Sequence, residues 1–421
     1  MPHYVTARWI PESGSGIARR DKQGGEYQAF VPDPLSGSTW AIRPALARKA
    51  AEVEREILKL SRNDASGQLE SIARLLMRSE AISSSRIEGI APNVDKVILA
   101  ELAQEEDVRG FKESAEAVAR NLTVLRSIEK SFASESTISV ELLEKFQAEL
   151  LGDTPSIPRG LRKMQNWIGG SNRTPIGAEF IPPPHEQVRE LVEDLCVFLD
   201  SASHGVLIQA AIAHAQFETI HPFADGNGRV GRAIIHGVLL RRGLTQQTIL
   251  PISLVLGTWS RRYVDGLSAF RQDNLSAWLE VFLDAAAEAV RQATLIAEKL
   301  EEIHSDWIDR VEETRRSDGK QRALRSDSIE FKLLQGLPAH PIVTTKTVQR
   351  LYGVTPGNAR KALERLQQAG LLRTKVIAKR GGLGYYADDI LDLLNQADRQ
   401  LVSSRFDTRL APPTGRAVPR P

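Results

Sequence analysis

Cysteine is almost absent from this chain of 421 residues, because Cys196 is the single one. One cysteine cannot form an internal disulfide, which excludes the class of small secreted domains that disulfides hold together. Long hydrophobic runs are also missing, since no stretch reaches the roughly 18 unbroken apolar residues of a membrane-spanning helix. The first residues show no basic segment followed by an apolar run, so a secretory signal is not expected. The sequence therefore predicts a cytoplasmic protein without a membrane partner.

An excess of charge of one sign is lacking as well. The chain has 55 Lys and Arg against 53 Asp and Glu, and its net charge of +2 does not by itself indicate a polyanionic partner. Apolar residues make up 42% of the chain, enough to bury cores, which excludes a disordered or fibrous protein. At roughly 150 residues per domain, the length corresponds to about three domains.

The composition and the spacing of apolar residues change several times along the chain. Gly, Pro and Ser are frequent in the first forty residues and predict turns and extended segments. From there to about residue 315, apolar residues recur three and four apart, as in helices. The last residues carry too few apolar side chains to pack. We therefore predict a mainly α fold composed of an N-terminal arm (1–44), a helical region (45–135), a central helical core (136–290), a helical linker (291–325), a C-terminal domain (326–400) and a disordered tail (401–421).

The most informative segment is residues 221–232, which read HPFADGNGRVGR. The apolar residues 206–213 before it predict a buried helix that ends at this loop, and helical spacing resumes from Val230. Gly226 and Gly228 have no Cβ, so successive backbone N–H groups can turn toward one point. The free N–H groups of the following helix add a partial positive charge there. The segment therefore predicts an anion-binding nest at a helix N-terminus.

The side chains around this nest indicate the kind of ligand. Arg229 and Arg232 lie within one turn of it, and guanidinium groups match phosphate oxygens bidentately. Asp225 could hold Mg²⁺ that bridges phosphates, and Asn227 could hydrogen-bond the same oxygens. His221 is the side chain of this run whose ordinary pKa suits a base near neutrality. The motif thus predicts a polyphosphate and a hydroxyl nucleophile; a plain loop whose His and Asp cap helix ends is the alternative.

This segment resembles the signature of the Fic family, H-x-F-x-[DE]-G-N-G-R-x-x-R. Fic proteins are helical bundles that mostly transfer AMP from ATP to a Ser, Thr or Tyr hydroxyl of a protein and release pyrophosphate. The resemblance implies that His221 is the base, that Asp225 holds Mg²⁺ and that Arg232 pairs with the terminal phosphate. The phosphorylating Doc branch typically has Lys at the position of Gly228, so the resemblance favours nucleotidyl transfer, including self-modification. The residues that would grip the phosphates are Gly226, Asn227, Gly228 and Arg229.

The resemblance also implies functional roles for two further features. Residues 167–184, WIGGSNRTPIGAEFIPPP, carry turn residues between short apolar runs and predict a hairpin. The resemblance implies that it is the family's β-hairpin flap, which binds the protein substrate by strand addition; a simple turn at Gly169 and Gly170 is the alternative. Tyr263 falls roughly where family members place an aromatic ring beside adenine, and a core tyrosine is the alternative.

The resemblance also implies an inhibitory segment, called the brake below, before the core. Residues 84–89, SSRIEG, fit the inhibitory pattern [ST]-x-x-x-E-[GN] of the family with Ser84, Glu88 and Gly89, and they lie on a predicted helix, as in class II Fic proteins. A Glu88 carboxylate paired with Arg232 would occupy the guanidinium that the terminal phosphate needs. An ordinary exposed glutamate is the alternative. In some relatives this glutamate also helps to remove AMP.

The C-terminal domain resembles a winged helix. Residues 344–352 predict a helix, Thr355 and Pro356 predict the cap and first position of a second helix, and two strand-like segments follow at 371–378 and 385–386. Between Val343 and Ala387 there are nine Lys or Arg and one acid, Glu364. Such a basic face predicts DNA or an acidic protein surface as a partner.

Two functions remain open at this stage. The first is an autoinhibited protein adenylyltransferase; the alternative is a nucleotide-sensing winged-helix regulator that binds DNA with little or no transfer. The first needs His221 as a base, whereas the second needs only the nest. A homodimer is one option for the oligomeric state. Cys196 lies on a predicted amphipathic helix and His214 on the predicted buried helix, and both are expected to be core residues.

Overall fold

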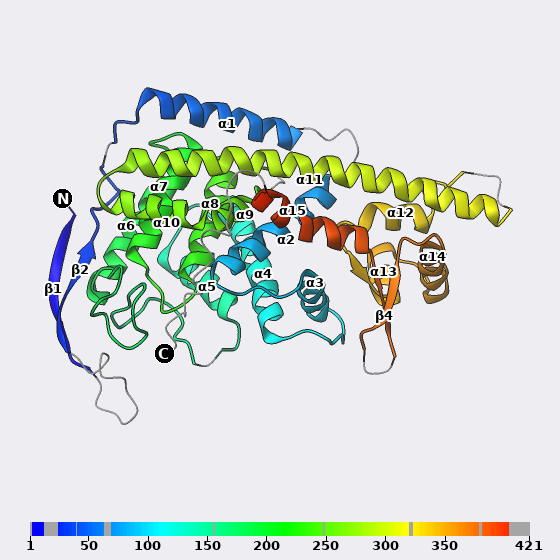
Figure 1. Ribbon diagram of the computed structural model, residues 1–421, viewed down its shortest axis with the longest axis horizontal. Coiled ribbons are helices and arrows are strands. Elements are labelled where there is room, and N and C mark those ends of the chain that lie inside the picture. The colour runs from blue at the N-terminus through cyan, green and yellow to red at the C-terminus, as the bar shows by residue number, and fades with distance from the viewer. Residues whose placement is uncertain are drawn as a thin grey trace.

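The computed structural model describes residues 2–11, 24–38, 40–62, 69–154, 156–246, 249–319, 323–378 and 381–403. As predicted, the fold is mainly α (Figure 1). No helix within these ranges is both long and apolar enough to cross a lipid bilayer. The helices up to the end of the linker are α1 (Pro44–Arg62), α2 (Leu69–Ile87), α3 (Val94–Ala103), α4 (Glu113–Ser134), α5 (Val140–Leu151), the short 3₁₀ helix η2 (His185–Gln187), α6 (Val188–Asp200), α7 (Val206–Ile220), α8 (Asn227–Arg241), α9 (Ile252–Thr258), α10 (Ser260–Arg271) and α11 (Leu275–Ser317).

Helix α7 forms the centre of the bundle. Every residue from Leu207 to Ile220 is buried, which confirms the buried helix predicted from residues 206–213. Helix α8 runs beside α7, and the indole of Trp278 on α11 donates to the Ala211 carbonyl at 2.8 Å. Because neighbouring helices cover α7 on all sides, the loop at its C-terminal end is held in a defined place.

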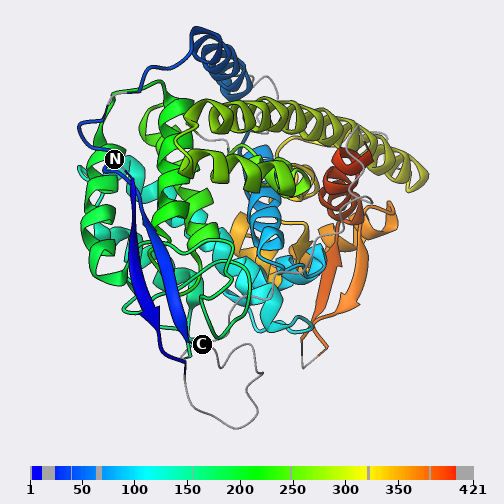
Figure 2. The ribbon, with the colours of Figure 1, turned by 60° about the vertical axis from the view of Figure 1, so that its left-hand side comes forward.

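Helix α11 is the longest element, with 43 residues, and it extends from the core into the C-terminal domain (Figure 1). Helix α1 lies along its outer side in both views, and the Lys49 ammonium pairs with Asp284 on α11 (Figures 1 and 2). The boundary predicted between residues 290 and 291 falls inside this helix, which continues there without a break.

The N-terminal arm contains a β-hairpin that the sequence analysis did not predict. Strands β1 (His3–Trp9) and β2 (Gly25–Val31) pair antiparallel along one side of the molecule (Figure 2). The Phe30 N–H donates to the Ile181 carbonyl at 2.9 Å, and the Trp9 ring meets the Trp167 ring edge-on at 5.4 Å. The overlooked sequence signal is the alternation of polar Glu26 and Gln28 with apolar Tyr27 and Ala29 along β2. The hairpin therefore covers the segment predicted as the flap.

The predicted flap itself contains much less regular strand than expected. Its pairing is one antiparallel bridge, in which Ile168 and Phe180 exchange backbone hydrogen bonds of 2.8 and 3.1 Å. Proline at 175 and at 182–184 has no N–H to donate. Glycines 169, 170 and 177 adopt positive φ values and turn the chain. The segment is thus a loop with a two-residue ladder rather than a β-hairpin of regular strands.

The C-terminal domain contains the two helices and two strands expected for it, together with elements at 329–336, 342–343 and 388–403 that were not predicted. Thr355 caps its helix as predicted and accepts a hydrogen bond from the Asn358 N–H, whereas Thr344, expected as the first residue of its helix, is the cap of that helix instead. The strands form a three-stranded sheet in the order β3-β5-β4. The winged-helix assignment stays a prediction. The elements are α12 (Ile329–Gly336), β3 (Ile342–Val343), α13 (Thr345–Tyr352), α14 (Pro356–Gln368), β4 (Arg373–Val376), β5 (Leu383–Tyr386) and α15 (Asp388–Ser403).

Helix α15 was not predicted, and it includes residues 401–403 of the expected tail; residues 404–421 lie outside the described residues. Several basic side chains of this domain pair with carboxylates, which reduces the charge available to a nucleic acid. A DNA or acidic protein partner therefore stays a prediction; residues 379 and 380 lie outside the described residues. The pairs are Arg350–Glu105, Arg360–Glu364, Arg365–Glu330 and Arg373–Asp388.

A buried arginine ties the C-terminal domain to helix α2. Arg78, whose side chain is 2% exposed, pairs with Glu101 on α3 at 2.9 Å and donates to the carbonyls of Pro338 and Ala339. Nearby, the Ser71 hydroxyl donates to the Gln335 carbonyl at 2.8 Å. The helix that Glu88 directly follows is thereby anchored to the domain behind it.

Arg78→Ala should lower the free energy of unfolding by about 3 kcal/mol, because it removes a buried cation that pairs with Glu101 and donates to two carbonyls, although Arg126 still pairs with that carboxylate at 2.7 Å. Urea unfolding of the full chain measures this change. The matched control is Arg74→Ala on the same helix, where an exposed pair with Glu70 is lost and a change within about 0.5 kcal/mol is expected. Equal effects of the two variants would contradict the anchoring role of Arg78.

Candidate active site

His221 lies where the central helix ends. It is the C-terminal cap of α7, with a left-handed backbone (φ 49°, ψ 61°), and its N–H donates to the Phe217 carbonyl at 2.9 Å. The His221 carbonyl accepts hydrogen bonds from Arg162 Nε at 3.0 Å and from the Asn166 amide at 3.3 Å. A non-glycine residue in this conformation is uncommon and persists when its surroundings hold it. These contacts therefore direct the chain from α7 into the glycine-rich loop.

The loop returns directly into α8, as predicted. Gly226 caps α8 with φ 90°, and a Cβ at this position would lie 2.9 Å from Leu150 Cδ2. The first intrahelical bond of α8 runs from the Val230 N–H to the Gly226 carbonyl at 3.0 Å. The N–H groups before Val230 have no partner within the helix and carry the positive end of its dipole. This end of α8 has the unpartnered N–H groups expected of the predicted anion-binding nest, and anion binding itself stays a prediction.

The side chain of Asn227 stabilises the conformation of the loop. Its side-chain oxygen accepts from the Phe223 N–H at 2.8 Å, and its amide donates to the Phe223 carbonyl at 2.8 Å. The side chain is 3% exposed. Direct contact of this amide with phosphate, as expected from sequence, is not what the structure supports, because both of its polar atoms already hold the loop closed. Only the backbone N–H of Asn227 remains to contribute to the nest.

Burial sets the protonation state of His221. Burial, together with Arg162 and Arg271, lowers the pKa of the His221 imidazole to about 3, although Glu88 acts in the opposite direction. The ring is therefore unprotonated at neutral pH and can accept a proton. The Arg162 guanidinium that contributes to this shift also donates to the Pro183 carbonyl, so it joins the catalytic loop to the flap segment.

The two motif arginines have different partners. Arg229 is 5% exposed, and its guanidinium lies 3.6 Å from Asp225 Oδ1. Arg232 is 1% exposed and donates from Nε to the Ser84 hydroxyl at 3.0 Å and from Nη2 to the Ser84 carbonyl at 2.8 Å. The same Nη2 donates to Glu88 Oε1 at 2.9 Å. The structure thus brings the predicted inhibitory pair together across 144 positions of sequence.

Glu88 directly follows helix α2 and lies against the first turn of α8, beside Gly228 and Arg232. Burial raises its pKa, but the nearby Arg232 and Arg229 outweigh burial and hold the pKa below its usual value. The carboxylate is therefore ionised at neutral pH, and it also keeps the pKa of Arg232 above its usual value against the effect of burial. Gly89 follows with φ 78°, a left-handed turn that ends the helical stretch. A Cβ at Gly228 would lie 2.1 Å from Glu88 Oε1, so only glycine leaves room for this contact.

Tyr263 does not have the position expected from the resemblance. Its ring is 5% exposed, its hydroxyl is 2.8 Å from His214 Nε2, and it packs against the Trp278 ring at 6.2 Å. A ring enclosed in this way has no free face for adenine. The core tyrosine that stood as the alternative is what the structure shows, and His214 and Cys196 are core residues, as predicted.

Asp225 is the carboxylate that could serve a metal at this site. Its side chain is 29% exposed, and Oδ1 accepts from the Gly226 N–H at 2.6 Å. Among the described residues, no group of three or more His, Cys, Asp or Glu side chains gathers as a metal cage. One carboxylate beside a phosphate nest nevertheless fits Mg²⁺, which commonly takes one or two carboxylates and completes its shell with phosphate and water.

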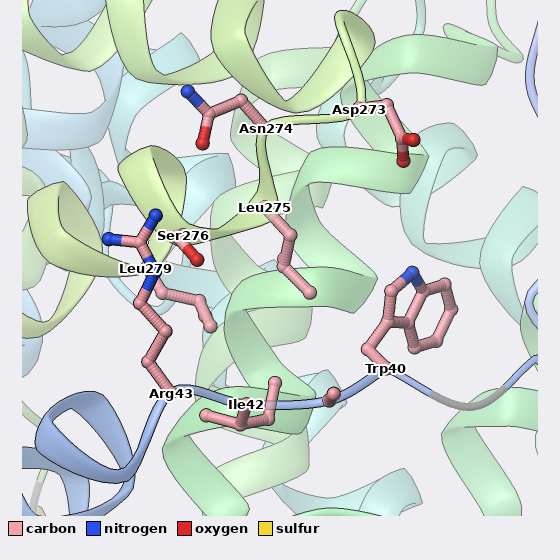
Figure 3. Close-up of a pocket in the computed structure, with 9 residues that line it drawn as sticks. Trp40, Ile42, Arg43, Asp273, Asn274, Leu275, Ser276 and Leu279 are labelled. Atoms are coloured by element: carbon pink, nitrogen blue, oxygen red, sulfur yellow. The ribbon is translucent and has the colours of Figure 1, made fainter.

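A separate pocket of about 280 Å³ lies at the start of α11 (Figure 3). It shares no lining residue with the 221–232 segment, so it does not belong to the candidate active site. Its lining is formed by Trp40, Ala41, Ile42, Arg43, Asp273, Asn274, Leu275, Ser276 and Leu279.

Fold and site together define a helical protein with a glycine-containing loop at a helix N-terminus, a half-buried unprotonated histidine and an arginine held by a carboxylate. The sequence model of the Fic/DOC family matches residues 137–239, which include this site. A crystal structure of a Fic family protein from Desulfovibrio desulfuricans G20 shares the fold, with a TM-score of 0.51 and 19% identity over 83% of this chain and 97% of that one. Residues 137–239 thus match the Fic/DOC family, as the resemblance predicted.

Two curated relatives are named as adenylyltransferases. A probable protein adenylyltransferase of Aquifex aeolicus is 30% identical over 177 residues, which cover 42% of this chain and 52% of the relative. The protein adenylyltransferase fic-1 of Caenorhabditis elegans is 28% identical over 138 residues, covering 32% of this chain and 25% of the relative. The chain thus spans about half the length of the first relative and a quarter of the second.

Proposed function

We propose that this protein is a protein adenylyltransferase that transfers AMP from ATP to a Ser, Thr or Tyr hydroxyl of a protein. The observation that carries the proposal is the convergence of His221, the α8 N-terminus and two buried arginines on one place. Relatives that share this part of the chain are named adenylyltransferases.

The chemistry follows from the state of each group. The unprotonated His221 imidazole takes the proton of the target hydroxyl as the hydroxyl oxygen attacks the α-phosphorus of ATP. The bond from the α-phosphorus to the bridging oxygen breaks, and pyrophosphate leaves with its electron pair. The α8 N-terminus and Arg229 stabilise the negative charge that shifts onto the phosphates. Mg²⁺ held by Asp225 would neutralise part of that charge.

The Glu88–Arg232 pair supports autoinhibition of this reaction. Arg232 has one guanidinium, and its Nη2 is engaged by Glu88 and by the Ser84 carbonyl. A terminal phosphate at this place would have to displace a carboxylate of the same sign of charge. ATP would then bind with its phosphates out of line for transfer.

The loop at 167–184 is proposed to receive the protein substrate. The chain before it is joined to the catalytic loop by the Arg162 and Asn166 side chains and by the Leu161–Phe223 bridge. A target strand lying along this loop would bring its hydroxyl toward His221. Self-modification is proposed as well, because the enzyme supplies its own hydroxyl groups at high local concentration.

The test is mass spectrometry of the full-length Glu88→Gly variant incubated with Mg²⁺ and an equal mixture of ATP, GTP, UTP and CTP. We expect a mass gain of one AMP on the enzyme or on an added lysate protein, and the gain identifies the donor nucleotide. A gain of one phosphate would contradict nucleotidyl transfer. Nucleotide binding without any covalent product would favour the sensor alternative instead.

A further inference from the structure

Glu218 lies one helical turn before His221, at the end of α7, and the motif does not include it. Its Oε2 is 3.9 Å from His221 Nδ1. His221 Nδ1 and Glu218 Oε1 are both buried, and among the described residues neither makes a hydrogen bond of full geometry; the Glu218 backbone carbonyl is the other acceptor near the His221 ring. Buried polar atoms are rarely left unpartnered in folded proteins, so two of them side by side indicate a functional requirement.

Neighbouring residues on α8 and α10 leave space for this carboxyl group and hold the helix turn that carries it. A Cβ at Gly231 on α8 would lie 2.4 Å from Glu218 Oε1, so the carboxyl occupies space that only glycine leaves. Arg271 on α10 donates to the Glu218 backbone carbonyl at 3.4 Å, and its guanidinium lies 3.6 Å from the centre of the Phe180 ring. The last turn of α7 is therefore braced from both α8 and α10.

The titratable and charged groups around Glu218 lie on α7, α8 and α10 and at the end of α2. Burial raises the pKa of Glu218 to about 7, and Glu88 at the end of α2 acts in the same direction. Arg232 from α8 and Arg271 from α10 lower the pKa, and the Tyr263 hydroxyl and His221 are the other titratable groups that face it. Glu218 therefore changes its charge near neutrality, where His221 does not.

We propose that Glu218 is a positioning residue for His221, accepting a hydrogen bond from Nδ1–H and thereby leaving Nε2 free to take the hydroxyl proton. This inference rests on the proposed function. A neutral imidazole carries one N–H, and its partner decides which nitrogen holds it. Ionised Glu218 also stabilises the imidazolium that forms when Nε2 accepts the proton. The contact of 3.9 Å shortens to a hydrogen bond as the ring turns, and such catalytic contacts are often long before substrate binds.

The kinetic test compares Glu218→Gln and Glu218→Leu, each in the Glu88→Gly background. The amide of Gln keeps an acceptor without charge, whereas Leu removes both. We expect kcat to fall about 10- to 100-fold for Gln and further for Leu, with the KM for ATP changed less than about twofold. Glu129→Gln is the matched control, because burial also raises the pKa of this carboxyl, which faces His236 and not His221.

The pH profile separates positioning from mere folding. With Glu218 present, kcat should rise with pH as the carboxyl loses its proton, and the absence of Glu88 places this rise at or below about pH 7. In Glu218→Gln the rise should disappear, because the amide does not titrate. A Gln variant that keeps both the parent kcat and the parent pH rise would overturn the proposal.

A second measurement needs no transfer at all. Nitrogen-15 NMR of histidine-labelled full-length protein, with the His221 signal assigned by its loss in His221→Ala, reports which ring nitrogen is protonated. We expect Nδ1–H in the parent and a shift toward Nε2–H in Glu218→Leu. A His221 ring that is protonated at Nε2 in the parent protein would contradict the inference. If Glu88→Gly transferred nothing, the proposed function would fail while this readout still decided the role of Glu218.

Discussion

Glu88→Gly should raise the rate of AMP transfer about 10- to 100-fold, because it frees Arg232 for the terminal phosphate. A hydrogen bond to a charged group contributes about 1.5–3 kcal/mol. Each 1.36 kcal/mol corresponds to about a tenfold change in rate. The Glu88 Oε1 to Arg232 Nη2 contact of 2.9 Å is of this kind. The measurement is transfer from labelled ATP to the enzyme and to lysate proteins at saturating Mg²⁺.

The position of Glu88 makes this variant easy to interpret. Glu88 follows the last residue of α2, so glycine does not interrupt the helix interior. Ser84 keeps both of its hydrogen bonds to Arg232, which holds the guanidinium in place. Glu70→Gly, at the exposed start of the same helix, is the matched control and should leave the rate unchanged. If Glu88→Gly and the parent transferred at the same rate, the brake assignment would be wrong.

His221→Ala in the Glu88→Gly background should lower transfer at least about 100-fold, since a positioned general base contributes roughly 10²- to 10⁴-fold. Nucleotide affinity should change little, because the nest consists of the α8 N-terminus and the arginines. Transfer from labelled ATP gives the first quantity, and calorimetric titration with ATP and Mg²⁺ gives the second. The combination identifies a group that acts in the reaction and not in binding.

The control for this variant is His304→Ala on α11, which removes a histidine away from the site and should leave transfer unaffected. Thermal unfolding of both variants checks that the fold survives. A His221→Ala enzyme that kept transfer within about threefold of its parent would exclude His221 as the base. A variant that lost ATP affinity along with transfer would instead assign His221 to the binding site.

The loop of residues 221–232 could be predicted from sequence because its chemistry is local. Gly226 takes a positive φ value, α8 begins at Asn227, and the motif side chains follow within a few residues. The Glu88–Arg232 pair is different, because its partners are far apart in sequence. The family pattern suggested it, and the packing of α2 beside α8 brings the two residues together.

Other parts of the site had no local signal that pointed to their role. Glu218 reads as one more residue of an apolar helix until its neighbours on α8 and α10 are known. Arg162 lies outside the motif and belongs to no sequence pattern, yet it is 5% exposed and donates to the His221 carbonyl. Asn227 and Tyr263 were assigned to the nucleotide, whereas packing directs one to the loop and the other to the core.

The sequence by itself determined the helical character of the chain, the nest at the start of α8 and the chemical types available there. Helix periodicity, caps and glycine turns act over a few residues, so they can be read from neighbouring letters. Only the tertiary structure decided which groups are buried, which arginine meets a carboxylate, and which histidine is kept unprotonated. Burial and charge pairing depend on segments that lie far apart in the chain, and they set pKa values and contacts that no local pattern contains.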